Sequence, residues 1–187
     1  MPNQDLVTLL GFNDSIFTLT RKAGDAAERS RRVDRLAPWG STALYDVILR
    51  GVEMLGRQTG RKALIVFTDG EDQGSHATIN DVERRLQSSD VTLYMIGQGR
   101  GVTLETLKKV MERLVEPDRR TRAVHRQRRR AARRRSRICS TSCRTSILLG
   151  YEPSNTKHDD VWRKIKVEVD GHHEVRARQG YRATTAK

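Results

Sequence analysis

The stretch KALIVFTDG, residues 62–70, decides the fold of this chain. Its apolar centre, residues 63–67, is uninterrupted, short, and bounded by charge on one side and Asp-Gly on the other. Such a run predicts a strand that is buried on both faces, as a central strand of a parallel sheet is. The Asp-Gly turn predicts that the chain leaves the sheet at its carboxyl edge, where ligands bind in open α/β sheets.

The segment before this strand, GSTALYDVILRGVEMLG at 40–56, predicts an amphipathic helix. Its apolar residues recur every three or four positions and share one face. Ser41 or Thr42 is the expected N-cap. A hydroxyl at a helix start can instead ligate a cation, and Asp69 after the strand can be a turn residue or a ligand of Mg²⁺ or Mn²⁺. The residues alone leave these alternatives open.

Strands and helices alternate over the first two thirds of the chain. Apolar runs predict strands at 6–12, 15–20 and 91–97, and helical spacing predicts helices at about 78–87 and 103–114, the first of them opened by a Thr78–Asp81 capping box. This order predicts an α/β fold, a parallel sheet with helices on both faces. Residues 147–187 alternate differently, and predict a small β-rich tail.

The charge of +13 is concentrated in one segment. Residues 119–144 hold twelve arginines and no acidic residue or lysine, so the rest of the chain is nearly neutral. The segment is either a product of two compensating frameshifts, a flexible basic segment without a dedicated role, or an arm that binds nucleic-acid phosphates in a salt-dependent way. Such dense like charge predicts poor order.

TDGED at 68–72 after a buried strand, GSTALYD at 40–46, and VTLYMIG about 25 residues later resemble the von Willebrand factor type A (VWA) domain. The tail LLGYEPSNTKHDDVWRKIKVEV resembles bacterial VWFA-related proteins, such as those of Acidobacteria. The resemblance implies a Rossmann-like, three-layer fold with a metal-ion-dependent adhesion site at its upper edge. It also implies that Thr42 and Asp69 are metal ligands, and that Mg²⁺, Mn²⁺ or Ca²⁺ binds a carboxylate of a protein or peptide partner.

The sequence departs from the family at its start, because no DxSxS motif precedes Thr42. The first strand and helix of the family are expected to be absent, which would open the sheet, bare apolar faces and weaken metal binding. A start at an internal or misassigned Met1, or a gene fragment, would explain the loss. The expected organisation is a truncated VWA domain at 1–117, an aberrant or disordered Arg-rich segment at 118–146, and the tail at 147–187.

The sequence therefore predicts a non-enzymatic protein-binding module, with nucleic-acid binding through 119–144 as the alternative. Neither GxSxG nor HExxH is present, the histidines lack ligand spacing, and Cys139 and Cys143 lack partners at zinc-site spacing. No run has the length of a membrane helix and no signal peptide is visible, so a cytoplasmic location is expected, although full-length relatives are often exported. Partner identity and oligomeric state stay open.

Overall fold

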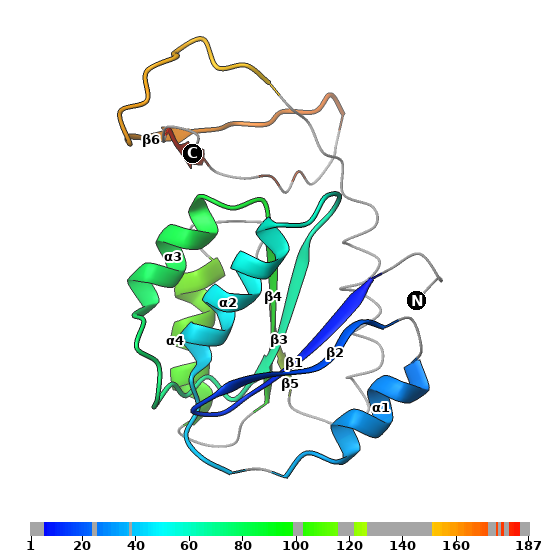
Figure 1. Cartoon of the computed structure of the whole chain (residues 1–187). Helices are drawn as coiled ribbons and strands as arrows, with labels where there is room; N and C mark the ends of the chain where they lie inside the picture. The colour runs from blue at the N-terminus through cyan, green and yellow to red at the C-terminus, as the bar shows by residue number, and fades with distance from the viewer. Residues whose placement is uncertain are drawn as a thin grey trace.

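The computed structural model describes residues 6–23, 26–37, 39–98, 103–115, 122–126, 151–171, 175, 177 and 180–183 (Figure 1). Two strands and two helices come first, strands and helices then alternate from β3 to β5, and two short strands follow in the tail. The elements are β1 (Val7–Phe12), β2 (Ile16–Ala23), α1 (Ala26–Asp34), α2 (Leu44–Gly56), β3 (Ala63–Thr68), α3 (Ile79–Gln87), β4 (Thr92–Gln98), α4 (Thr103–Val115), β5 (Arg122–Arg126), β6 (Trp162–Lys164) and β7 (Gly180–Arg182).

The centre of the body is a three-stranded parallel sheet in the order β3-β4-β5. β3 pairs with β4 from Ala63↔Thr92 to Thr68↔Gly97, without a register shift. Each strand returns to the sheet through a helix, as parallel strands require. The α/β class predicted from the sequence is confirmed.

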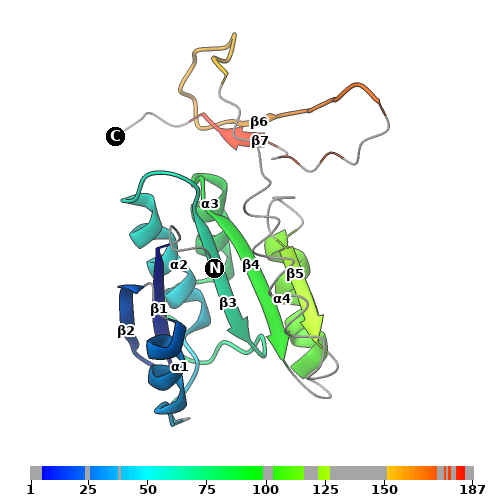
Figure 2. The same ribbon diagram turned by 90° about the vertical axis from the view of Figure 1, so that its right-hand side faces the viewer.

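The main core lies between this sheet and one layer of helices, α2, α3 and α4 (Figures 1 and 2). The helical spacing predicted for α2 is confirmed, since Leu44, Ile48 and Val52 are buried. Gly51 lets α2 approach β3, because a Cβ there would lie 2.7 Å from Leu64 Cδ1. The buried cluster is Leu44, Ile48, Val52, Val66, Val82, Leu86, Val91, Leu93, Met95, Val110, Met111 and Leu114.

These three helices share one core on one face of the sheet. The prediction that β3 is a central strand buried on both faces is wrong. β3 is an edge strand among the described residues, and Ile65 and Phe67 are 38% and 56% exposed. β4 is the strand buried on both faces, with Tyr94 and Ile96 buried as well as Leu93.

β1 and β2 form a separate antiparallel hairpin. Both predicted strands are therefore confirmed, but neither pairs with β3. Phe12, at the end of β1, packs against the main core, so the hairpin lies against the same core as the helices. Among the described residues, β1-β2 and β3-β4-β5 therefore form two separate sheets.

Two further expectations concern the Arg-rich segment and the tail. Within the Arg-rich segment, Arg122–Arg126 form β5 and pair in parallel with β4. Residues 127–146, both cysteines included, lie outside the described part. In the tail, the strand expected across WRKIKVEVD ends at Lys164, and β6 pairs with β7 over three residues. No helix of the described residues is long and apolar enough to cross a membrane.

Candidate functional site

Three loops meet at the end of the molecule toward which β3 and β4 point (Figure 2). They are the turn 13–15 after β1, the segment 39–43 before α2, and the loop 69–77 after β3. This end is the carboxyl edge that the sequence predicted as the ligand-binding edge. We call it the rim.

The loop 69–77 caps helix α2 from outside the helix. The predicted cap by Ser41 or Thr42 is wrong, because Ala43 occupies the N-cap position and no side chain of the cap residue bonds to the helix. Asp72 Oδ1 instead accepts hydrogen bonds from the backbone N–H groups of Leu44 (2.7 Å) and Tyr45 (3.2 Å). A carboxylate at this position satisfies helix N–H groups and complements the positive end of the helix dipole.

Ser75 completes this cap. Its Oγ accepts from the N–H groups of Tyr45 (3.0 Å) and Asp46 (3.2 Å), and donates to Asp72 Oδ1 at 2.5 Å. Burial, followed by the charge of Asp72, raises the pKa of the Tyr45 phenol. The cap thus ties the first turn of α2 to a loop about thirty residues later.

Asp46 holds the far end of the same loop. Its carboxylate accepts from the backbone N–H groups of His76 (3.0 Å) and Ala77 (2.9 Å), and its Oδ2 lies 3.2 Å from His76 Nδ1. Burial alone would raise the pKa of Asp46, but these hydrogen bonds and the His76 side chain outweigh it and lower the pKa below its usual value. The loop therefore caps the helix through Asp72 and Ser75, and the helix in turn fixes the end of the loop through Asp46.

The two predicted metal ligands lie on segments that this arrangement joins. The Thr42 carbonyl accepts from the N–H groups of Gln73 (2.9 Å) and Gly74 (3.1 Å), and Thr42 is half-buried. Asp69 is exposed and follows β3 directly. Its Oδ1 accepts from Glu71 N–H at 3.3 Å, across the turn at Gly70, whose φ is 90°. Both residues thus belong to one rim on one body.

The turn after β1 supports the segment that carries Thr42. The Asn13 carbonyl accepts from Ala43 N–H at 2.7 Å, and Asn13 Nδ2 donates to the Trp39 carbonyl at 3.3 Å. The Asp14 carboxylate lies against Gly40, since a Cβ there would be 3.2 Å from Asp14 Oδ2. Two features are therefore added to the predicted site, an acidic group at Asp14 and an exposed indole at Trp39, 65% exposed.

The oxygen donors at the rim are of the type that a hard cation prefers, but they are too few to fill its coordination sphere. A hydroxyl and a carboxylate are ligands that Mg²⁺ accepts, yet six oxygen ligands are needed. Asp72 Oδ1 is already engaged as the helix cap. Within the described ranges, no three His, Cys, Asp or Glu side chains come together as a metal site. Water or a partner would have to complete the coordination.

Sequence analysis missed the roles of Asp72 and Ser75, although TDGED contains the first of them. Sequence rules for helix caps consider only the residues next to a helix, whereas Asp72 lies 28 positions from Leu44. The available signal was the pair of polar side chains in a short loop at the carboxyl edge of the sheet. The Thr78–Asp81 capping box, which lies within one local window, is confirmed.

Comparisons with known proteins place residues 2–126 under the family model of the von Willebrand factor type A domain. Two of the solved structures that share the fold come from Bacteroides species. The conserved hypothetical protein BatB from Bacteroides thetaiotaomicron has a TM-score of 0.57 at 14% identity, covering 78% of this chain and 82% of that one. An aerotolerance-related membrane protein from Bacteroides fragilis NCTC 9343, with multiple mutations to serines, has a TM-score of 0.54 at 12% identity, covering 76% and 81%. The comparison with curated proteins gives no match.

Proposed function

Because the chain belongs to the von Willebrand factor type A domain family, we propose that it binds a protein partner at the rim, through a divalent cation held by Thr42 and Asp69. VWA domains often mediate protein interactions and are typically non-enzymatic. The observation that carries the proposal is the joining of the Thr42 and Asp69 segments by the Gln73 and Gly74 hydrogen bonds to the Thr42 carbonyl.

The exposure of Asp69 supports this role. A carboxylate at the end of a buried strand can be reached by a cation and by a partner only where it is not covered, and Asp69 is exposed. The neighbouring Thr68 is buried, and its Oγ1 accepts from Gly70 N–H at 3.0 Å, which fixes the turn that presents Asp69. Placement on a fixed turn lowers the entropy lost when a ligand binds.

The cation would supply an electrostatic link between the rim and an acidic side chain of the partner. Thr42 and Asp69 give two oxygen donors, which leaves coordination positions for water and for a partner carboxylate. Two protein donors predict weak binding of the cation alone. They also predict that the partner's carboxylate strengthens it, since that group adds a third charged or polar ligand.

The alternative of nucleic-acid binding through 119–144 falls mainly on residues outside the described part, and no described contact favours it. It stays a prediction of the sequence, with a steep loss of affinity in salt as its signature. The expected cytoplasmic location also stays a prediction.

Titration of the purified chain with Mg²⁺ and Mn²⁺ in a calorimeter tests the proposal, with glutarate added as a simple carboxylate ligand. We expect weak cation binding that is lost with Asp69→Ala and reduced with Thr42→Val. Glu112→Gln is the control, since Glu112 is an exposed acid on α4 that pairs with Lys108 at 3.7 Å. Equal cation binding by the wild-type chain and Asp69→Ala, or no binding by either, would contradict the proposal.

A further inference from the structure

The sequence contains two Asp-Gly steps, Asp69-Gly70 after β3 and Asp170-Gly171 in the tail. At an Asp-Gly step the chain forms a succinimide ring readily, because glycine has no side chain that hinders attack of its backbone nitrogen on the preceding carboxyl carbon. The two steps also share a backbone conformation, since φ is 90° at Gly70 and 97° at Gly171. A difference in reactivity between them therefore comes from their surroundings.

The backbone nitrogen of Gly70 is held inside the fold. Its N–H donates to Thr68 Oγ1 at 3.0 Å, and both Thr68 and Gly70 are buried. Asp69 Oδ1 accepts from the N–H of Glu71 at 3.3 Å, which holds the carboxylate over the same turn. Ring closure requires that the Gly70 nitrogen lose its proton and that the Asp69 carboxyl carbon move onto it. Both hydrogen bonds therefore have to break before the ring can form.

The backbone nitrogen of Gly171 is not held in this way. Asp170 and Gly171 are both exposed, and no described residue forms a hydrogen bond or an ion pair with either of them. No described contact therefore has to break before this nitrogen reaches the carboxyl carbon of Asp170. The same dipeptide thus stands in the chain once with its nitrogen bonded and buried, and once with it open to solvent.

We propose that Asp170 is a site of spontaneous isomerisation to isoaspartate, and that the hydrogen bond from Gly70 to Thr68 protects Asp69 from the same reaction. The Gly171 nitrogen bonds to the carboxyl carbon of Asp170, and its proton leaves with the carboxyl hydroxyl as water. Water then adds to the main-chain carbonyl of the ring and breaks its bond to nitrogen, which gives isoaspartate, or adds to the other carbonyl and restores aspartate. Only water is released and taken up, so no oxidant, reductant or cofactor takes part.

The protection by Thr68 has a consequence at the rim. Isomerisation inserts the side-chain carbon into the backbone and leaves the free carboxylate on the main-chain carbon. At residue 69 this change would move the carboxylate away from the turn that presents it. The consequence for cation binding rests on the proposed function, whereas the isomerisation itself does not.

The test incubates the full chain at neutral pH in water labelled with heavy oxygen. Each passage through the ring places one labelled oxygen in the carboxyl group, and peptide mass spectrometry locates the label. In the folded chain, residue 170 should take up label at least about fivefold faster than residue 69, which is the factor expected when one hydrogen bond has to break first. In guanidinium chloride, where the fold is lost, the two steps should take up label at similar rates.

Two variants of the protecting residue complete the test. Thr68→Val removes the acceptor of Gly70 N–H, and should speed labelling of residue 69 about fivefold while residue 170 keeps its rate. Thr68→Ser keeps the hydroxyl and is the matched control, which should label as the wild type does. Circular dichroism checks that both variants fold, and the comparison of folded and unfolded wild type decides the proposal if Thr68→Val does not.

Three results would overturn the proposal. They are equal labelling of residues 69 and 170 in the folded chain, no labelling of residue 170, and labelling of residue 69 in a folded Thr68→Val that matches the wild type. Each of these is read from the label alone. A chain that shows the expected labelling but binds no cation would contradict only the proposed cation site.

Discussion

Removal of the Asp72 carboxylate should destabilise the chain more than any other change of an acidic side chain in the loop 69–77. Asp72→Ala removes the acceptor of Leu44 N–H, which has no other acceptor among the described residues. The Tyr45 N–H keeps a second acceptor in Ser75 Oγ. The change therefore leaves one backbone donor unsatisfied at a buried helix start and removes a charge that complements the helix dipole.

The expected loss follows from those two contributions. Loss of a helix N-cap costs about 0.5–2 kcal/mol, and a hydrogen bond to a charged group contributes about 1.5–3 kcal/mol. We expect Asp72→Ala to lower the free energy of unfolding by about 2 kcal/mol. For a chain of this size, that is a fall in Tm of about 4–8 °C. Asp72→Asn keeps one acceptor oxygen without the charge, and should lose about half as much.

Urea unfolding followed by circular dichroism measures the loss. Glu71→Ala is the matched control, since it removes a neighbouring acid whose carboxylate bonds to Gln73 rather than to the helix, and it should change stability by less than about 0.5 kcal/mol. Hydrogen exchange at Leu44 and Tyr45 should accelerate in Asp72→Ala. A loss no larger than that of Glu71→Ala, or unchanged exchange at the start of α2, would refute the assignment of Asp72 as the cap.

Two further predictions concern pH and the core. The pKa of Asp46 is lower in the folded chain than its usual value, so the stability that its hydrogen bonds contribute is fully present above the usual carboxyl pKa and is lost as pH falls through the lower, folded pKa. Asp46→Asn should therefore flatten acid unfolding below about pH 4, measured by fluorescence, and a curve that matches the wild type would count against the His76 contacts. Leu93→Ala, at a fully buried position of β4, should cost about 2–5 kcal/mol in urea unfolding, whereas Leu6→Ala, at an exposed position, should cost less than about 0.5 kcal/mol. Similar losses in the two variants would contradict the core described for β4.

The sequence predicted the elements of the body because each depends on a local pattern. The apolar run of β3, the spacing of Leu44, Ile48 and Val52 in α2, and the capping box before α3 are all visible within about fifteen residues. These patterns follow directly from the periods of strands and helices. They also identify the rim, since the carboxyl ends of parallel strands meet at one edge of the sheet.

The exposure of β3 could not be predicted from its own residues. An apolar run indicates that both faces suit burial, but whether a neighbour covers them depends on strands elsewhere in the chain. A signal was available in the absence of a DxSxS motif before Thr42, which the family resemblance makes meaningful. The strand predicted in the tail is longer than the observed one for a similar reason. The alternation in WRKIKVEVD suits a strand, yet Val167 and Val169 are exposed and β6 ends at Lys164.

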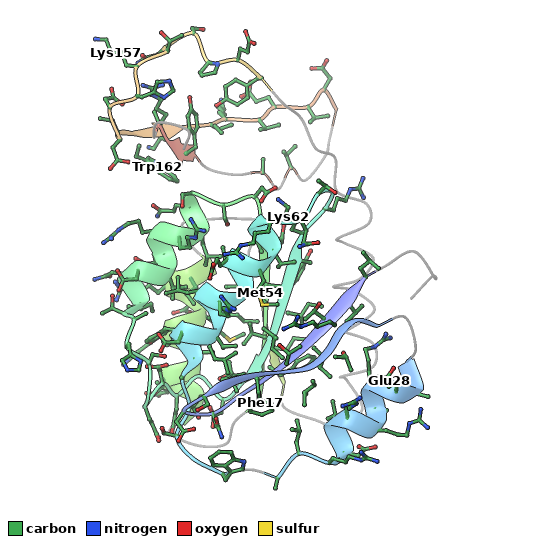
Figure 3. All side chains as sticks on the ribbon, in the orientation of Figure 1. Phe17, Glu28, Met54, Lys62, Lys157 and Trp162 are labelled. Atoms are coloured by element: carbon green, nitrogen blue, oxygen red, sulfur yellow. The ribbon has the colours of Figure 1, made fainter. Side chains whose placement is uncertain are left out.

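The tail packs on one end of the body, where β7 contacts α3. Figure 3 shows Trp162 in the tail and Lys62 at the end of the body that faces the tail. Phe17, on β2, lies toward the opposite end. Lys62 Nζ lies 2.7 Å from Asp90 Oδ2 at this end of the sheet. The tail therefore lies at the end away from the rim, and its Tyr151 and Tyr181 rings contact each other edge to face at 6.3 Å.

Paramagnetic broadening by Mn²⁺ of the backbone amide signals tests the central claim most directly, because it locates the cation on the chain. The account predicts broadening centred on Thr42 and on Asp69 to Glu71, reversed by chelator and absent in Asp69→Ala. Broadening centred on another part of the molecule, or the same pattern in Asp69→Ala, would contradict the proposed cation site.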